Sequence, residues 1–444
     1  MLSAVKVTTE IYFKSLRQTS IVELERMRNK SHFYYVGFMN IKRVLVTLRM
    51  SDLQRRMAMG KSGLPPPGGG SGGGSRRPNS GRRSTKPEHW SSYFQTSRVI
   101  EIPTGKFNIY ECDSLSGDET GGATLVLLHG GGYSGLTWSV FSKELVKLVG
   151  VRIVALDLRG HGETTTQDDK DLRIETLAQD VACLIDSLGC KGAVILAGHS
   201  MGGAIAVHTA SYLKEAVLSG LVVIDVVEGT ALEALGSMQS FLRGRPDRFY
   251  SLPYAVEWSV RSGQTRNFES ACVSMPGQLK NIQTNEPATK SITPDSSKED
   301  ESKKRLPPLR AANSIAEEDE NGESQPSAIF SSPASTPSQE PEYTWRIDLS
   351  KTENNWPGWF EGLSSKFLSV SAAKMLLLAG VDRLDKDLTV GQMQGKFQMQ
   401  ILPQAGHAVH EDVPDRVAEV LATFLIRHKF SQALSEFKPS FPAC

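Results

Sequence analysis

A glycine-flanked serine between an apolar run and a run of small residues constrains this chain more than any other stretch. Residues 193–197 read AVILA, which predicts a buried strand, and residues 202–210 are small, apolar and free of proline, which predicts a helix. Between them stands Gly-His-Ser-Met-Gly, a G-x-S-x-G pattern centred on Ser200. On so sharp a turn the flanking residues crowd each other unless they lack a Cβ. The turn therefore raises the Ser200 hydroxyl above the sheet as a candidate nucleophile.

A second glycine-rich loop is expected to complete an oxyanion hole with this turn. Residues 123–128 (ATLVLL) predict a buried strand that runs directly into His-Gly-Gly-Gly at 129–132. Glycines in such a loop allow backbone N–H groups to come within hydrogen-bond range of a substrate oxygen. We therefore assign the backbone N–H groups of Gly131 and Met201 to the oxyanion hole, because Met201 begins the helix after the serine.

Apolar runs alternate with stretches of helical spacing along much of the chain. Strands are predicted at 97–102, 107–111, 123–128, 151–158, 193–197, 221–226, 374–379 and 397–402, and helices at 174–188, 202–210 and 413–430. Alternating strands and helices imply a parallel sheet with crossover helices. The predicted class is α/β, with an α/β-hydrolase fold: a mostly parallel twisted sheet, helices on both faces, and a helical cap that carries a disordered insertion.

Shifts in composition divide the chain into four segments. Residues 1–89 hold a basic stretch and the linker GGGSGGGS, which predicts a disordered N-terminal extension. Residues 90–230 and 361–444 are expected to form the two parts of the hydrolase core, and residues 231–360 a cap over the active site. Within the cap, about 278–340 is rich in Ser, Pro, Lys and Glu and almost without aromatic residues, so we expect a disordered insertion there.

A serine hydroxyl is a weak nucleophile at neutral pH and needs a base, which in turn needs an acid to orient it. His407 comes after the last predicted strand and before the last helix, where this fold places its catalytic histidine. His410 lies close by in the sequence but is expected on the loop toward the helix. His161 follows an earlier strand and is expected to shape a turn. His407 is therefore the predicted base.

Spacing along the chain does not by itself decide which aspartate is the catalytic acid. Asp382 follows the predicted strand before His407, where most α/β-hydrolases keep this residue. Asp225 ends the strand after Ser200, which is an alternative position, and spacing favours Asp382 over it. Asp157 also ends a strand, but it precedes the serine and is expected to be structural.

Composition bears on which partners the protein binds and on the cellular compartment in which it works. The formal net charge is +1, so no overall field attracts nucleic acid or acidic lipid, and no apolar run reaches the length of a membrane span. The five cysteines are odd in number and fit no metal pattern, which favours reduced thiols in an intracellular protein. A cluster of Arg76, Arg77, Arg82 and Arg83 is typical either of a nuclear import signal or of a solubilising tail. We expect a cytoplasmic or nuclear protein, or both.

Several longer strings go beyond these generic motifs. They include LLHGGGYSGLTW, VALDLRGHGET, GHSMGGAIAVHTA, IDVVEGTALEAL, LLLAGVDRLDKDLT and GHAVHED. From about residue 90 to the C-terminus, without the insertion, the chain resembles the protein phosphatase methylesterase family. The resemblance implies a serine esterase with Ser200 as nucleophile, His407 as base and Asp225 as acid. This chemistry needs no metal or organic cofactor.

The resemblance also implies a substrate and a partner. The substrate is the methyl ester on the C-terminal leucine of the catalytic subunit of protein phosphatase 2A, and that subunit is the expected partner of an otherwise monomeric protein. Two other interpretations stay open: a phosphatase-binding regulator that acts by binding, and a general hydrolase of small esters.

Overall fold

The computed structural model describes residues 84–114, 122–214, 217–294, 342–380, 384–434 and 437–439. Nearly all of the predicted N-terminal extension and most of the predicted insertion therefore lie outside the described residues. The described part begins before the first predicted strand pair and contains the segments around Ser200, Asp225 and His407, whereas residues 381–383 lie outside it.

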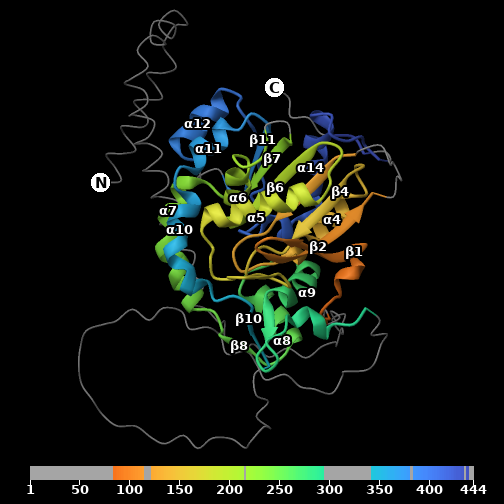
Figure 1. Cartoon of the computed structure of the whole chain (residues 1–444), viewed down its shortest axis with the longest axis vertical. Coiled ribbons are helices and arrows are strands. Elements are labelled where there is room, and N and C mark those ends of the chain that lie inside the picture. Colours follow the sequence, from red (N-terminus) through yellow and green to blue (C-terminus); the bar gives the residue numbers. More distant parts are fainter. Residues whose placement is uncertain are drawn as a thin grey trace, which may run out of the picture. The chain divides into compact units, whose positions relative to one another are not determined.

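Nine strands of the described residues form one sheet (Figure 1). Its order is β1 (Thr96–Ile102), β2 (Gly105–Asp113), β4 (Arg152–Leu156), β3 (Thr124–Leu128), β6 (Val194–His199), β7 (Leu218–Ile224), β11 (Ala373–Leu378) and β12 (Gln398–Ile401), with β5 (Thr165–Thr166) paired to β2. The pairs β1–β2 and β2–β4 are antiparallel, whereas every neighbouring pair from β4 to β12 is parallel. The predicted mostly parallel sheet is confirmed.

The strands are apolar on both faces because both faces are covered. Leu125 and Leu127 of β3 belong to one buried cluster and Val126 and Leu128 to another, as expected when successive side chains point to opposite sides of a sheet. The first cluster includes residues of α4 (Ser139–Leu145) and α14 (Pro414–Arg427); the second includes residues of α5 (Ile174–Ser187), α6 (Met201–Thr209) and α11 (Leu363–Ser369). The sheet is thus a middle layer between two layers of helices.

A group of helices with a small sheet interrupts this alternation after β7. It contains α7 (Glu228–Arg243), α8 (Leu252–Arg261), α9 (Phe268–Gly277), η3 (Ala288–Ser291), η4 (Leu349–Asn355), α10 (Trp356–Phe360) and a three-stranded sheet of β8 (Arg248–Phe249), β10 (Tyr343–Trp345) and β9 (Leu279–Asn281). Helices α7 and α10 pack against the second of the two clusters of the main sheet, whereas a separate buried cluster around Phe249 and Met275 holds α8, α9 and the small sheet together. This unit corresponds to the predicted cap.

The predicted start of the insertion, about residue 278, is wrong. Residues 279–281 form β9, which pairs with β10 on the far side of the insertion in sequence. Leu279 is fully buried and Ala288 is almost so. Their burial ties residues 278–294 to the cap, and a short strand of this kind gives only a weak pattern in the sequence.

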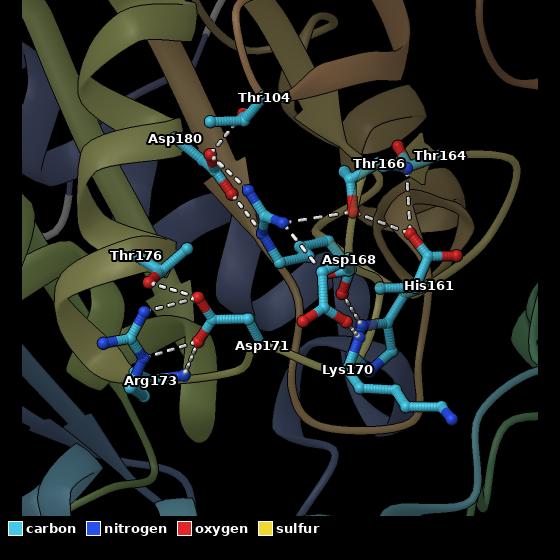
Figure 2. A network of polar contacts seen from close by, with 12 residues as sticks. Thr104, His161, Thr164, Thr166, Asp168, Lys170, Asp171, Arg173, Thr176 and Asp180 are labelled. Atoms are coloured by element: carbon cyan, nitrogen blue, oxygen red, sulfur yellow. Dashed lines mark hydrogen bonds and ion pairs between the residues drawn. The ribbon is translucent and has the colours of Figure 1, made fainter.

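A buried ion pair fixes the loop that follows β4 (Figure 2). The Arg159 guanidinium donates two hydrogen bonds to the Asp180 carboxylate of α5, at 2.7 and 2.9 Å, and both side chains are almost fully buried. Thr104 donates a further hydrogen bond to Asp180 at 2.7 Å, and Arg159 reaches the Asp168 carbonyl at 2.9 Å. A bidentate pair of this kind restricts the orientation of the guanidinium group, so it fixes the loop that carries His161.

Candidate active site

Ser200 stands on a strained turn between β6 and α6. Its φ of 52° is in a region that non-glycine residues rarely adopt, and its N–H donates to the Ile224 carbonyl of β7 at 2.9 Å. A Cβ on Gly198 would lie 2.1 Å from the Gly202 carbonyl oxygen, and a Cβ on Gly202 would lie 2.4 Å from the Leu128 carbonyl oxygen, so both positions flanking the serine require glycine. The predicted glycine-crowded turn is confirmed, and it holds the Ser200 hydroxyl clear of the strand.

A continuous hydrogen-bond chain joins Ser200, His407 and Asp225. The His407 Nε2 atom lies 3.1 Å from the Ser200 Oγ atom, and the His407 Nδ1 atom lies 2.8 Å from an Asp225 carboxylate oxygen. The Asp225 side chain is fully buried, whereas the His407 ring is half exposed. With Nδ1–H donating to the carboxylate, Nε2 is the acceptor for the serine hydroxyl, which is the geometry of a base oriented by an acid.

Asp225, like Ser200, is held in place by a strained backbone and by hydrogen bonds to a neighbouring strand. Its φ is also 52°, its N–H donates to the Leu377 carbonyl of β11 at 2.8 Å, and its other carboxylate oxygen accepts the Ala379 N–H at 3.0 Å. The first bond comes from β11, the strand beside β7, and the second from the residue directly after β11, so the end of the sheet orients this carboxylate toward His407. Asp382, the alternative acid, lies outside the described residues.

The oxyanion loop at 129–132 lies against the serine turn. It follows β3, which is adjacent to β6 in the sheet, and a Cβ on Gly130 would lie 3.4 Å from the Ser200 Cβ atom. A Cβ on Gly131 would lie 3.7 Å from the Met201 sulfur atom. The structure therefore brings the two segments of the predicted oxyanion hole together at one end of the sheet.

Two buried histidines hold this loop in place. His161 Nε2 accepts the Gly132 N–H at 2.9 Å while its Nδ1–H donates to the Arg159 carbonyl at 2.8 Å. His129 Nδ1–H donates to the Gly130 carbonyl at 2.7 Å, and its Nε2 accepts the Leu158 N–H at 3.1 Å. Burial lowers the pKa of His161 to about 4 and that of His129 well below its ordinary value. Both rings are therefore neutral at pH 7, as these bonds require.

Hydrogen bonds to the cap hold the loop that carries His407. One Asp412 carboxylate oxygen accepts the Gly406 N–H at 2.6 Å, and the other accepts the Arg266 N–H at 2.7 Å. Arg266 belongs to the connection between α8 and α9. From the other side, the His199 ring donates to the His407 carbonyl at 2.9 Å. These contacts fix the backbone on both sides of the His407 ring.

The residue before Asp412 joins the same loop to both the core and the cap. The fully buried Glu411 carboxylate accepts hydroxyl hydrogen bonds from Thr137 at 2.7 Å and from Thr265 at 2.5 Å. Burial raises the pKa of this carboxyl to about 7. His410 is also buried, with its ring 4.0 Å from that of Trp138, and its Nε2 lies 2.9 Å from the Thr137 hydroxyl. His410 thus packs in the core, on the side away from bulk solvent.

Apart from the Ser200 site, the described residues contain neither a metal site nor a membrane-spanning helix. No group of three or more His, Cys, Asp or Glu side chains there is placed to hold a metal ion. Cys112, Cys183, Cys190 and Cys272 are free thiols. No helix in the described ranges combines the length and the apolar character needed to cross a membrane. The Ser200 site is therefore the cluster of reactive groups to which a function has to be assigned.

Comparisons with known proteins agree with this fold and indicate the class of reaction. Residues 125–420 match the model of the alpha/beta hydrolase family. Protein phosphatase methylesterase 1 of Mus musculus is 50% identical over 408 residues, which cover 89% of this chain and 100% of the relative. The chain belongs to the protein phosphatase methylesterase 1 family. It is accordingly a carboxylic ester hydrolase, and the family resemblance expected from the motifs is confirmed.

A more distant relative supports the same assignment, and a solved structure shares the fold. A probable protein phosphatase methylesterase 1 of Caenorhabditis elegans is 41% identical over 357 residues and covers 80% of this chain and 81% of its own. The crystal structure of E-2-(acetamidomethylene)succinate hydrolase superposes with a TM-score of 0.52 at 15% identity, covering 74% of this chain and 99% of that one. At so low an identity the second likeness concerns the fold alone.

Proposed function

We propose that this methylesterase removes the methyl ester from the C-terminal leucine of the protein phosphatase 2A catalytic subunit through a Ser200–His407–Asp225 triad. The observation that carries the mechanism is the unbroken hydrogen-bond chain from the buried Asp225 carboxylate through His407 to the Ser200 hydroxyl. The family assignment supports a protein phosphatase as the substrate, and it makes that phosphatase subunit the expected partner.

The first half of the reaction forms an acyl-enzyme. Ser200 Oγ attacks the ester carbonyl carbon while His407 Nε2 takes the hydroxyl proton, and Asp225 stabilises the resulting imidazolium. The negative charge on the carbonyl oxygen is held by the backbone N–H groups of Gly131 and Met201. When the tetrahedral intermediate collapses, the bond to the methoxy oxygen breaks. His407 returns its proton to that oxygen, and methanol leaves.

The second half frees the carboxylate. Water attacks the acyl carbon as His407 takes one of its protons, and a second tetrahedral intermediate forms in the same oxyanion hole. Its collapse breaks the bond to Ser200 Oγ, which recovers its proton from His407. The products are a free C-terminal carboxylate and methanol. Each step uses only these side chains, backbone N–H groups and water, so the proposal includes no cofactor.

Mass spectrometry of a methylated phosphatase C-terminus tests the proposal. Incubation with the wild-type chain should convert the methyl ester to the free carboxylate, and Ser200→Ala should leave the ester intact. Ser200→Ala should still bind the phosphatase, which separates binding from chemistry. An intact ester in the presence of folded wild-type chain, or much faster hydrolysis of simple esters than of the methylated tail, would contradict the assigned substrate.

A further inference from the structure

The cap presents an arginine stacked on an aromatic ring near the oxyanion loop. Arg245 follows the end of α7, and the carbon at the centre of its guanidinium group lies 4.1 Å from the centre of the Trp345 ring. The Trp345 indole donates to the Pro246 carbonyl at 2.7 Å and packs edge-on against Phe249 and Trp258. Trp345 is therefore held by aromatic side chains of the cap core, and its ring carries the arginine.

The hydrogen-bonding capacity of this guanidinium group is unmet within the described residues. An arginine side chain carries five N–H donors in a planar fork. Arg245 forms no ion pair and no side-chain hydrogen bond there, and its Nε atom is buried without a partner. The nearby Asp348 carboxylate is already engaged by Lys351 at 3.1 Å and by the Ser350 hydroxyl at 2.6 Å. A partly buried cation without an anion is unusual, because desolvation disfavours its charged form.

The Arg245–Trp345 pair lies close to the site of ester cleavage. Arg245 is near enough to Tyr133, which directly follows the oxyanion loop, to oppose the burial that raises the pKa of the Tyr133 phenol. The Tyr133 ring meets the His199 ring edge-on, with centres 5.8 Å apart. Leu349 belongs to the same cap segment as Trp345. A Cβ on Gly132 would lie 3.0 Å from its side chain. The cap segment that carries Trp345 and Leu349 therefore contacts the oxyanion loop.

We propose that Arg245, held against Trp345, is a specificity residue that binds an acidic side chain of the substrate peptide upstream of the methyl ester. The inference rests on the proposed function, in which a peptide tail extends from Ser200. The ester itself is uncharged, and its carbonyl oxygen occupies the oxyanion hole. An anion for Arg245 therefore has to come from an earlier residue. The planar fork of guanidinium matches the two oxygens of a carboxylate.

Paired peptides test the assignment. Each pair ends in the same leucine methyl ester and differs only by Asp or Asn at one position, which is moved stepwise along the residues before the leucine. For the wild-type chain we expect kcat/KM to be about 10- to 100-fold higher with Asp at one position, as a charge-assisted pair implies. In Arg245→Gln that ratio should fall to near one, and Arg245→Lys should give an intermediate ratio because it keeps the charge without the fork.

Arg243→Gln is the matched control, because Arg243 is an exposed arginine at the end of α7 that contacts Gln239. This variant should keep the wild-type preference for Asp. Equal wild-type rates on Asp and Asn peptides at every position would overturn the inference without any variant. An unchanged Asp preference in Arg245→Gln would also overturn it. If the proposed function itself were wrong, the wild-type chain would hydrolyse neither peptide of any pair, which is a different result.

Discussion

His161 accepts the backbone N–H of Gly132 at 2.9 Å and so joins the loop after β4 to the oxyanion loop after β3. This histidine was expected only to shape a turn. In the structure it fixes the loop whose N–H groups we propose to stabilise the developing negative charge, and it is joined through the Arg159 carbonyl to the buried Arg159–Asp180 pair. The oxyanion loop is therefore supported by side chains from a neighbouring segment as well as by its own glycines.

His161→Ala should lower kcat about 10- to 100-fold with a smaller effect on KM. The loss of the acceptor lets the oxyanion loop move, and small misplacements near the reacting atoms reduce rates on this scale. Steady-state kinetics on a methyl ester peptide measure the effect. His161→Gln supplies an amide oxygen as acceptor and should recover part of the loss. Equal kcat values for wild type and His161→Ala would show that the loop needs no such support.

Asp412→Ala should also lower kcat, on the order of 10- to 100-fold, because it removes the acceptor for the Gly406 N–H beside His407. Active-site titration with a phosphonate that labels Ser200 separates misplacement from unfolding. A misplaced His407 reduces kcat per labelled site, whereas unfolding reduces only the number of sites. Asp415→Asn, an exposed aspartate in the first turn of α14, is the control and should match the wild type.

Asp225→Asn should reduce kcat on the order of 10⁴-fold, because an amide cannot hold the His407 tautomer that accepts the serine proton. Asp382→Asn should have a far smaller effect if Asp225 is the acid. The two variants can be compared by burst and steady-state kinetics on the same methyl ester. The reverse order of effects would transfer the role to Asp382 and contradict the proposed triad.

The sequence predicts Ser200 and His407 because each stands in a local pattern, a glycine-flanked turn in one case and the segment between the last strand and last helix in the other. It could not choose the acid on spacing. The strands β7 and β11 are parallel neighbours, so Asp225 and a residue just after β11 follow the same edge of the sheet. Spacing favours Asp382 only modestly over the adjacent strand end at Asp225, and the choice of Asp225 depended on family resemblance.

The supporting residues could not be predicted for a different physical reason. His161 and Asp412 act on backbone N–H groups of Gly132 and Arg266, which are remote in the sequence. A backbone donor has no residue type to mark it, so no motif signals the contact. The only local sign for Asp412 is an acidic pair shortly after His407, and such a pair is also typical of a helix N-terminus.

Acid should destabilise the chain partly through His161, whose pKa is lowered by burial from 6.5 to about 4. Between these values the unfolded chain binds a proton at this site and the folded chain does not, so the free energy of unfolding falls as the pH falls. This contribution is about 1.4 kcal/mol per pH unit. Denaturant titrations at several pH values should therefore show a shallower pH dependence in His161→Gln than in the wild type.

Glu411 should have the opposite effect on the pH dependence of the free energy of unfolding. Burial raises the pKa of its carboxyl from 4.5 to about 7, so below pH 7 the folded chain binds a proton more readily than the unfolded chain. Glu411 therefore adds stability as the pH falls from about 7 toward 4.5, and Glu411→Gln should steepen the acid loss. If the free energy of unfolding changed with pH in the same way in the wild type and in both variants, neither pKa would differ between the folded and the unfolded chain.

Two deletions within the insertion should differ in stability. Removing residues 278–340 eliminates β9, with the fully buried Leu279, and the nearly buried Ala288, whereas removing 296–340 keeps them. Because β10 pairs with both β8 and β9, the longer deletion also leaves one edge of β10 without its partner. Burying a leucine side chain contributes about 2 kcal/mol, so the longer deletion should have a lower Tm by several degrees. Differential scanning calorimetry of the two chains measures this difference, and equal Tm values would mean that residues 278–294 contribute nothing to the cap.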